Sequence, residues 1–363
     1  MQKVHETQAL QALEAFDLGG EALSATPYGN GHINDTFLVK TTGRDYILQR
    51  INTDIFTDPD GLMANISAVT AHLGQRIRAR GGDPLRQTLT VVPTRRGKAF
   101  HRDENGCWRV YVFVTGSVTH ETADTPAVLE SAGRAFGAFV LDLGDFPAHT
   151  LHETIPDFHN MELRARQLQE AIEQDKAGRV AGVADIIADL QKDMHEMCKA
   201  ERLFREGKLP KRICHCDTKV NNMMYDKQGN VLCVIDLDTV MPSFVFSDYG
   251  DFLRTGANFV AEDDPKIENV GFNQDIFRAF TEGYIESARS FLTPVEVENL
   301  PYAVALFPFM QCVRFFADYL NGDTYYKIAY PEHNLVRTRN QQALYHRVTD
   351  NYDMMDNFIR TLI

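Results

Sequence analysis

The most informative segment of the chain reads Cys214-His215-Cys216-Asp217-Thr218-Lys219-Val220-Asn221-Asn222. A short apolar run, residues 231–235, follows it and leads directly into Asp236. Each polar residue alone is most often part of a capped turn, but H-x-D, a following Asn and a strand ending in Asp form a far more specific set. We therefore predict a compact strand-and-turn region over residues 212–251 that carries the chemistry of this protein.

These residue types suit the transfer of a phosphoryl group from a nucleotide. The reaction needs one carboxylate that orients the acceptor hydroxyl and accepts its proton, and oxygen ligands that hold Mg²⁺ on the phosphates. We expect Asp217 to be the catalytic base, and Asn222 and Asp236 to be the metal ligands. The motif thus predicts an enzyme that uses ATP and Mg²⁺.

His215 lies inside this motif, but we expect it to pack under the site and not to act as the base. A zinc site built from Cys214, His215 and Cys216 is conceivable on paper. Neighbouring residues in an extended segment point to opposite faces, however, so the three side chains cannot all meet one metal ion. We interpret the two cysteines as packing residues.

A second motif lies near the N-terminus, where Tyr28-Gly29-Asn30-Gly31-His32-Ile33-Asn34-Asp35-Thr36 separates two strand-like runs. A tight turn at Asn30-Gly31 can direct backbone N–H groups toward phosphates, and a hairpin without a ligand is the alternative. We expect Gly29, Asn30, Gly31, Asn34 and Thr36 to contact the nucleotide.

Apolar spacing divides the chain at about residue 115. Before it, strand patterns surround one helix at residues 62–73, and after it helical patterns dominate. The helical patterns cover 125–143, 161–174, 183–204, 273–290, 294–318 and 339–363. This predicts an α+β fold with a small β-rich N-terminal lobe, residues 1–115, and a larger helical C-terminal lobe, residues 116–363. The ligand site is expected in the cleft between the lobes.

The amino-acid composition limits the classes of binding partner that we expect. Lys and Arg number 37 against 50 Asp and Glu, a net charge of −13, which disfavours a broad nucleic-acid or membrane surface. We find no run of about 18 apolar residues and no basic, then apolar, N-terminus, so we predict neither a membrane span nor a signal peptide. Six scattered cysteines fit a reducing compartment, and we expect a cytoplasmic protein.

The chain resembles the aminoglycoside phosphotransferase and choline kinase superfamily, and within it the N-acetylhexosamine 1-kinases. The resemblance rests on these segments: YGNGHIND, YILQRIN, WRVYVF, HCDTKVNN, VIDLDTVMPS, FSDYGDFLRTGAN, RFFADYLNGDTYY and YPEHNLVRTR. The last two make it specific for the hexosamine kinases. It implies a bilobal, protein-kinase-like fold and the phosphorylation of N-acetylglucosamine or N-acetylgalactosamine at the anomeric hydroxyl.

The resemblance also implies roles for single residues. Tyr111, Val112 and Phe113 resemble the hinge whose backbone binds adenine, and Asp248 resembles the carboxylate that braces the catalytic loop.

For the sugar, the resemblance implies His32, Arg314 and Tyr325 beside Asp217. A planar guanidinium and an aromatic face suit an N-acetyl sugar, whereas an ion pair between Arg314 and Asp318, four residues later, is the structural alternative.

One position departs from the superfamily. Gln49 stands in YILQR where a strand lysine would contact the nucleotide phosphates and pair with a helix glutamate, and the following helix offers Asn65 and no Glu. Gln49 and Asn65 could replace the ion pair by hydrogen bonding, or Arg50 could reach in, although strand alternation points Arg50 to the opposite face. We keep Gln49 among the expected nucleotide-binding residues.

Other functions stay open at this point. A kinase of the same superfamily could act on an amino alcohol, homoserine or an aminoglycoside, and a pseudokinase could bind sugar or nucleotide without transfer. A hydrolase is disfavoured because the chain has no G-x-S-x-G elbow and no Cys- or Ser-x-Pro-x-Arg motif.

Overall fold

The computed structural model describes residues 6–29, 33–119 and 125–363. It divides into two compact units that interleave along the chain. Unit 1 comprises Met1–His120, Asp145–Pro156 and Asn222–Met241, and unit 2 comprises Glu121–Gly144, Asp157–Asn221 and Pro242–Ile363. The contiguous domains 1–115 and 116–363 stay a prediction.

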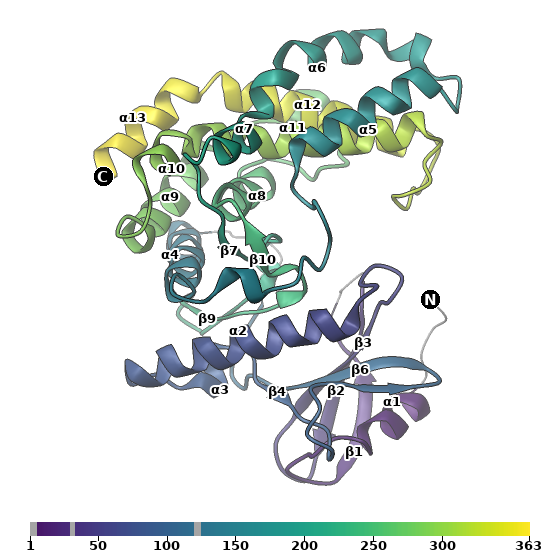
Figure 1. The fold of residues 1–363 in the computed structure, drawn as a ribbon, viewed down its shortest axis with the longest axis vertical. Helices are drawn as coiled ribbons and strands as arrows, with labels where there is room; N and C mark the ends of the chain where they lie inside the picture. The colour runs from purple at the N-terminus through teal and green to yellow at the C-terminus, as the bar shows by residue number, and fades with distance from the viewer. Residues whose placement is uncertain (1–5, 30–32, 120–124) are drawn as a thin grey trace. The chain divides into compact units, whose positions relative to one another are not determined.

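Unit 1 is built on an antiparallel sheet whose described strands run in the order β1-β2-β3-β6-β4, with β5 paired to β6 (Figure 1). Its strands are β1 (Ala22–Pro27), β2 (Asp35–Thr41), β3 (Tyr46–Ile51), β4 (Val91–Val92), β5 (His101–Asp103) and β6 (Gly106–Val112). Its helices are α1 (Glu6–Leu13), α2 (Pro59–Ala79) and α3 (Pro84–Gln87). The β-rich character predicted for this part of the chain is confirmed.

Strand alternation gives the sheet two different faces. One face packs with α1 into an apolar core that includes Phe16, Leu48 and Trp108. The intervening residues of β3 and β6 point the other way, and there Gln49 and Arg109 are paired across the two strands. That second face carries polar chemistry inside the fold.

A separate hairpin, β8 (Met223–Tyr225) and β9 (Val231–Val234), also belongs to unit 1. Its register pairs Met223 with Val234. The backbone N–H of Ile235 donates to the carbonyl of Asn222 at 2.9 Å, which extends the pairing beyond the strands. Asn222 and Asp236 therefore flank the same end of one hairpin.

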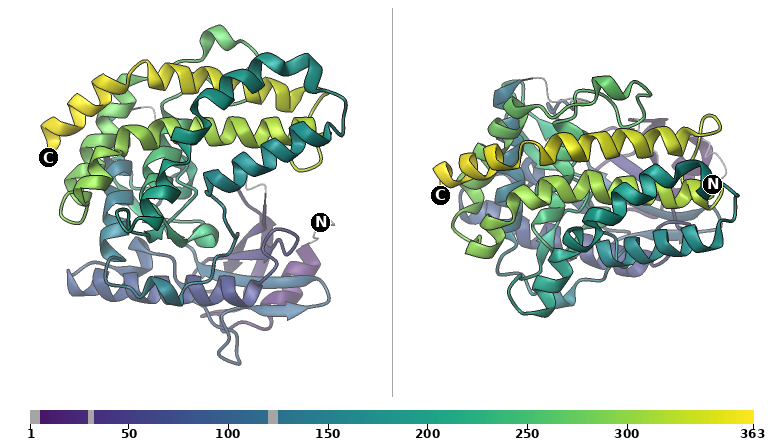
Figure 2. Two further views of the ribbon diagram at one scale, coloured as in Figure 1. Left: turned by 45° about the horizontal axis from the view of Figure 1, so that its top comes forward. Right: turned by 90° about the horizontal axis from the view of Figure 1, so that it is seen from above.

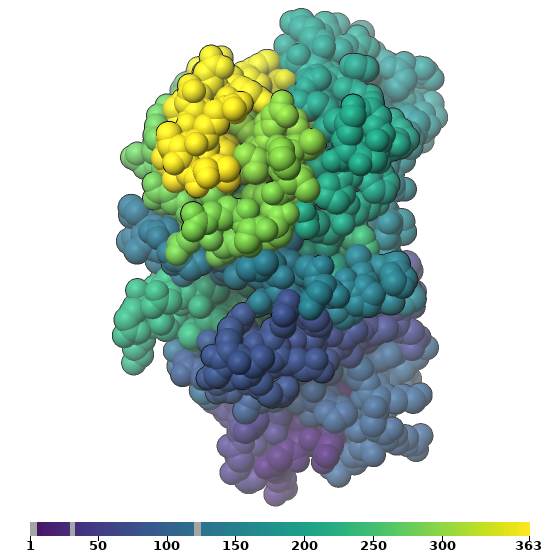
Figure 3. Space-filling model, turned by 60° about the vertical axis from the view of Figure 1, so that its left-hand side comes forward, coloured from purple at the N-terminus to yellow at the C-terminus, as the bar shows by residue number. Residues whose placement is uncertain are grey.

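Unit 2 is mainly helical. Its helices are α4 (Pro126–Asp142), α5 (Met161–Gln174), α6 (Ala184–Met197), α7 (Lys199–Arg205), α8 (Phe246–Gly256), α9 (Gln274–Ala288), α10 (Pro294–Glu298), α11 (Leu300–Leu320), α12 (His333–Thr349) and α13 (Tyr352–Leu362). Short strands β7 (Arg212–Cys214) and β10 (Met241–Ser243) pair beside them. Figure 2 shows α11 and α12 side by side, and Figure 3 shows the yellow C-terminal helix against the green α9–α10 segment. This confirms the predicted α+β class.

Glycine allows the close approach of α4 and α9. A Cβ atom on Gly133 would lie 2.0 Å from the carbonyl oxygen of Phe280, and one on Gly283 would lie 1.9 Å from the carbonyl oxygen of Glu130. Because neither distance is possible for real atoms, these positions require glycine, and the backbones of the two helices can touch.

Two sequence interpretations were wrong. The region 212–251 is not purely strand and turn, because Phe246, Tyr249 and Phe252 are buried at helical spacing and begin α8. The chain also contains an apolar stretch, since the 21 residues of α11 are long and apolar enough to cross a membrane by length and composition. In the structure 83% of its most apolar window is buried, as in the core helix of a globular unit.

Candidate functional site

Residues 215–219 of the H-x-D motif lie in unit 2, directly after β7. The carboxylate of Asp248, on α8, accepts the backbone N–H of His215 at 2.9 Å and that of Cys216 at 2.8 Å. Thr218 Oγ1 donates to the carbonyl of Asp248 at 2.8 Å. Burial raises the pKa of Asp248 to about 6, although its bonds to the loop oppose the rise. One buried carboxyl thus fixes the backbone on the N-terminal side of Asp217.

The residues around Asp217 are held by packing and by an unusual backbone. His215 is fully buried and its ring lies edge-on to Phe136 and Phe139. Cys216 has a φ of 64°, a left-handed conformation that costs free energy outside glycine and is common at functional sites. Cys214 and Cys216 are buried, and among the described residues no group of three or more His, Cys, Asp or Glu could hold a metal ion.

Asp217 is the single carboxylate of residues 214–222, and its side chain is 18% exposed. Lys219 Nζ lies 2.9 Å from Asp217 Oδ1 and 3.0 Å from Oδ2. The two side chains thus form a close ion pair at the wall of the loop. Lys219 was not identified from the sequence as part of the site.

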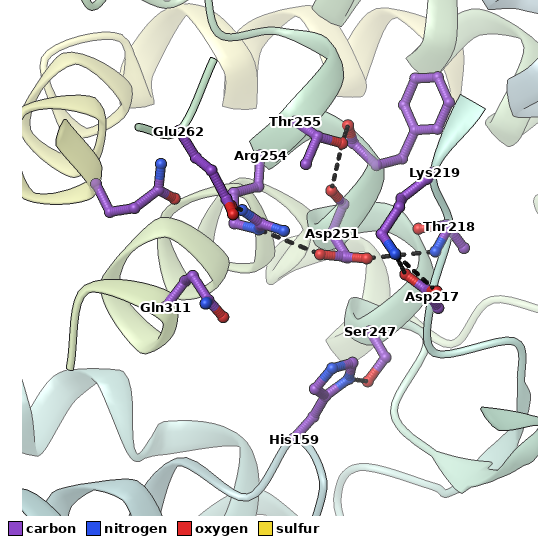
Figure 4. Close-up of polar contacts among 12 residues, drawn as sticks. His159, Asp217, Thr218, Lys219, Ser247, Asp251, Arg254, Thr255, Glu262 and Gln311 are labelled. Atoms are coloured by element: carbon purple, nitrogen blue, oxygen red, sulfur yellow. Dashed lines mark hydrogen bonds and ion pairs between the residues drawn. The ribbon is translucent and has the colours of Figure 1, made fainter. Parts of the chain in front are cut away.

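Asp217 lines a cavity of about 150 Å³ that lies entirely within unit 2. The other lining residues are Phe158, His159, Cys216, Lys219, Asp251, Arg254, Phe307, Met310, Gln311 and Arg314. Figure 4 shows His159, Gln311 and the Asp251–Arg254 pair around this space, with Asp217 and Lys219 beside it. We call this cavity the Asp217 pocket.

Arg314 lies in the Asp217 pocket and forms no ion pair with Asp318 in the part of the chain that the structure describes. Its guanidinium carbon is 5.5 Å from the ring centroid of Phe158 and 5.8 Å from that of Tyr326, and its Nη1 donates to Gln311 Oε1 at 3.1 Å. Asp318 instead accepts the backbone N–H groups of residues 324–326. The structural alternative for Arg314 is therefore not realised.

Tyr325 does not line the Asp217 pocket. Its backbone N–H is held by Asp318, its ring is 73% exposed, and it meets Tyr326 edge-on at 4.8 Å between centroids. His32, the other residue expected at the sugar, falls outside the described residues, as do Asn30 and Gly31. Of the four residues expected at the acceptor, the structure places Asp217 and Arg314 in one cavity.

His159 is a pocket residue for which the sequence gives no signal. It stacks on Phe158, with centroids 4.4 Å apart, and its Nδ1 lies 3.0 Å from Ser247 Oγ. Its neighbours Phe158 and Asn160 form no recognised motif, and its place depends on α8 and α11, which come much later in the chain.

The candidate metal ligands belong to unit 1. Asn222 and Asp236 flank one end of the β8–β9 hairpin, and Asp236 adopts a left-handed φ of 59°. Carboxylate and amide oxygens suit Mg²⁺, which takes one or two protein ligands and completes its shell with phosphate oxygens and water. The two donors fit this ion, and the assignment of Asn222 and Asp236 stays a prediction.

Arg109, on β6, is the cation that contacts Gln49. Its guanidinium forms a two-pronged ion pair with Asp238, with Nη1 to Oδ1 at 2.5 Å and Nη2 to Oδ2 at 2.9 Å. Its Nε donates to Gln49 Oε1 at 3.0 Å. Arg109 is 1% exposed and Asp238 2% exposed, so this pair is shielded from water. Asp238 lies in the turn that begins at Asp236, and the pair therefore anchors that turn.

The substitutes proposed from the sequence have other partners. Asn65 bonds to the backbone of His152 and to the carbonyl of Val240, and Arg50 pairs with Asp35 at 2.6 Å. Arg109 was missed because its link to Gln49 depends on strand register across 60 residues.

The glycine-rich segment is tied to the same network. Asn34 donates to Asp238 Oδ2 at 2.8 Å and accepts the N–H of Asn52, and Thr36 Oγ1 accepts from Gln49 Nε2 at 3.0 Å. Gly29 has a φ of 75°, which favours glycine. Asn34, Thr36 and Gln49 thus form internal bonds, and their nucleotide contacts stay a prediction.

The expected hinge ends strand β6. The N–H of Val112 donates to Thr90 and that of Phe113 to Asp45, at 3.0 and 3.1 Å. Tyr111 is buried in the sheet, while the ring of Phe113 meets Tyr28 edge-on at 6.1 Å. An adenine that bonds to either N–H group would have to replace an existing bond, and the hinge role stays a prediction.

Comparisons with known proteins agree with this architecture. The model of a family described as "Phosphotransferase enzyme family" matches residues 24–284, more than half of the chain. An aminoglycoside phosphotransferase from Alicyclobacillus acidocaldarius has a TM-score of 0.63 at 13% identity, over 98% of each chain.

Two further solved structures are similar. A microcompartment-associated aminopropanol kinase gives a TM-score of 0.56 at 17% identity, covering 96% of this chain and 98% of its own. A choline kinase from Cryptosporidium parvum gives 0.57 at 11% identity, covering 93% and 92%. At these identities the likeness shows the fold.

Proposed function

The chain belongs to the phosphotransferase enzyme family, and we propose that it transfers the γ-phosphoryl group of ATP to the anomeric hydroxyl of an N-acetylhexosamine. The observation that carries this proposal is the Asp217 pocket, where a carboxylate, a guanidinium and aromatic rings line one small cavity. Proton acceptor, planar donor and apolar face are the parts that a sugar hydroxyl and its ring require.

In the proposed reaction, Asp217 accepts the proton of the anomeric hydroxyl. That oxygen forms a bond to the γ-phosphorus while the bond from the γ-phosphorus to the bridging oxygen of ADP breaks, so that hexosamine 1-phosphate and ADP leave. Anomeric hydroxyls are the most acidic of a sugar, which suits a carboxylate base. Mg²⁺, held by Asn222 and Asp236, would neutralise charge on the phosphates.

The charges of the Asp217 pocket favour a neutral acceptor. Asp217 pairs with Lys219, and Asp251 pairs with Arg254 at 3.2 Å. Arg254 also pairs with Glu262 at 2.8 Å, and Arg314 forms no ion pair within the described part of the chain, so no carboxylate here is left unpaired. An amino alcohol or an aminoglycoside carries positive charge and needs unpaired carboxylates, so these acceptors fit the Asp217 pocket less well.

The test is a coupled ADP-release assay with N-acetylglucosamine, N-acetylgalactosamine, glucosamine, choline and homoserine as acceptors. We expect turnover with the two N-acetyl sugars and at least about tenfold lower kcat/KM with the amines, the size of one unfavourable charge contact. Good choline turnover without sugar turnover would contradict the acceptor class but not the transferase family. The absence of ADP release with every acceptor, in a protein that still binds nucleotide or sugar, would favour the pseudokinase alternative.

A further inference from the structure

His159 is held in one orientation at the wall of the Asp217 pocket. Its ring stacks on Phe158, at an interplanar angle of 19°, and meets Phe307 edge-on with centroids 4.9 Å apart. Its Nδ1 bonds to Ser247 Oγ at 3.0 Å, and Ser247 Oγ in turn lies 2.7 Å from Ser243 Oγ (Figure 4). Two rings and a chain of hydroxyl groups thus fix the imidazole plane.

Within the part of the chain that the structure describes, the second ring nitrogen of His159, Nε2, has no protein partner. Nδ1 is taken by Ser247, while the ring itself lines the cavity together with Asp217 and Arg314. A polar nitrogen at the wall of a small cavity loses free energy unless a ligand or water bonds to it. Nε2 is therefore available for a group inside the pocket.

The imidazole is neutral over the pH range in which a kinase works. Burial, reinforced by the charges of Arg314 and Arg164, lowers the pKa of His159 to about 3, against a smaller opposite effect from Asp217. A neutral imidazole has one donor and one acceptor nitrogen. The bond between Nδ1 and Ser247 therefore determines whether Nε2 is the donor or the acceptor. The residue offers a directed hydrogen bond without charge, which suits a hydroxyl or an amide.

We propose that His159 is a specificity-determining residue whose Nε2 hydrogen-bonds a hydroxyl or acetamido group of the neutral acceptor. The inference rests on the proposed function and adds a contact that orients the sugar against Asp217. An acceptor without a group at this point leaves Nε2 unpaired, and a site of this kind rejects such analogues strongly.

Two amide variants separate acceptor binding from a structural role. The amide of His159→Gln ends near the position of Nε2, whereas the amide of His159→Asn ends near Nδ1 and can keep the bond to Ser247. His159→Phe keeps the ring contacts and loses both bonds. His195→Gln, at an exposed histidine on α6, is the matched control.

The experiment determines the KM for N-acetylglucosamine, the KM for ATP and the melting temperature of each variant. His159→Phe and His159→Asn should raise the sugar KM about tenfold or more, the cost of one unpaired buried group, with the ATP KM within about twofold. His159→Gln should stay within about threefold of the wild type. The control should not differ from it.

The opposite ranking of the two amide variants would contradict the inference. If His159→Asn behaves like the wild type while His159→Gln is impaired, the bond to Ser247 is what matters and His159 is structural. Near-normal kinetics of His159→Phe would show that no hydrogen bond from His159 contributes to sugar binding. Failure of the wild type itself to phosphorylate N-acetylglucosamine is a different result, because it contradicts the proposed function and the inference with it.

Discussion

At the scale of single residues, the proposed chemistry depends on one carboxylate, Asp217, whose surroundings are fixed by other residues. Asp248 holds the loop backbone, Cys216 takes the left-handed turn, and Asp217 projects into the pocket with Lys219 beside it. Because these bonds involve the backbone or neighbouring side chains, Asp217 can be changed without removing what positions it.

The first prediction concerns Asp217. Asp217→Asn keeps the shape of the side chain but cannot accept a proton, so kcat should fall about 10²-fold or more while the melting temperature and sugar affinity stay close to wild type. Asp353→Asn, at an exposed position of α13, is the control in the same assay. Turnover of Asp217→Asn near that of the control would exclude Asp217 as the base.

Variants of Arg314 test whether the planar shape or the charge of its guanidinium binds the acceptor. Arg314→Lys keeps the positive charge but loses the planar contacts with Phe158 and Tyr326. We expect the sugar KM to rise about tenfold, with the ATP KM unchanged, and Arg314→Gln to be no better. Steady-state kinetics with both substrates varied decides this, and full activity of Arg314→Lys would mean that charge alone suffices.

At the scale of elements, the register of β3 and β6 determines which cation contacts Gln49. Gln49 and Arg109 are paired across the strands, and Arg109 reaches from there to Asp238. A buried carboxylate that loses its only described cationic partner is strongly unfavourable. The ion pair should therefore matter for the stability of unit 1.

Arg109→Met should lower the free energy of unfolding of unit 1 by about 3–5 kcal/mol, because it leaves Asp238 charged and buried. Adding Asp238→Leu should recover most of this loss. Trp108, the single tryptophan of the chain, neighbours Arg109 on β6 and reports the transition by fluorescence.

Arg102→Met is the matched control, since Arg102 pairs with Asp60 on the exposed surface of the same unit and its loss should lower the stability far less. Equal losses for Arg109→Met and Arg102→Met would contradict the role given to the buried pair.

The contact between α7 and α5 predicts a pH dependence of stability. Glu201 accepts the first backbone N–H of α5, from Met161, at 2.7 Å, while its Oε2 is buried without a partner among the described residues. Burial raises the pKa of Glu201 to about 7, above its unfolded value of about 4.3. Its contribution to stability is therefore present below the unfolded pKa and is lost as the pH rises through about 7.

Unfolding measured between about pH 5 and pH 8 should show this loss, about 2–3 kcal/mol from the pKa difference, in the wild type. Glu201→Gln cannot titrate and should lack this part of the slope. Parallel curves for the two proteins, followed by circular dichroism, would show that Glu201 does not titrate in this range.

At the scale of the whole molecule, what could be predicted was local in sequence. The spacing from Asp217 to Asp236, the strand alternation of WRVYVF and the helical stripes are each visible within a short window, and they gave the α+β fold and the loop. Arg109 and His159 could not be found this way. Arg109 acts through a register across 60 residues, and His159 lies in an irregular segment whose partners, Ser247 and Phe307, follow much later.

The same reasoning explains why the sequence alone could not show what kind of helix α11 is. A window of the sequence cannot tell a membrane span from a core helix, because both are long and apolar. Only the packing of α5, α8 and α12 around α11, which buries most of its surface, distinguishes the two.

The most direct test of the central claim is the position of the phosphate in the product. Purified enzyme is incubated with ATP, Mg²⁺ and N-acetylglucosamine, and the product is analysed by phosphorus NMR and by phosphate release in warm dilute acid. An anomeric phosphate should couple to the anomeric proton and hydrolyse readily, because its carbon leaves as an oxocarbenium ion. An acid-stable product coupled to the protons at carbon 6 would contradict the account.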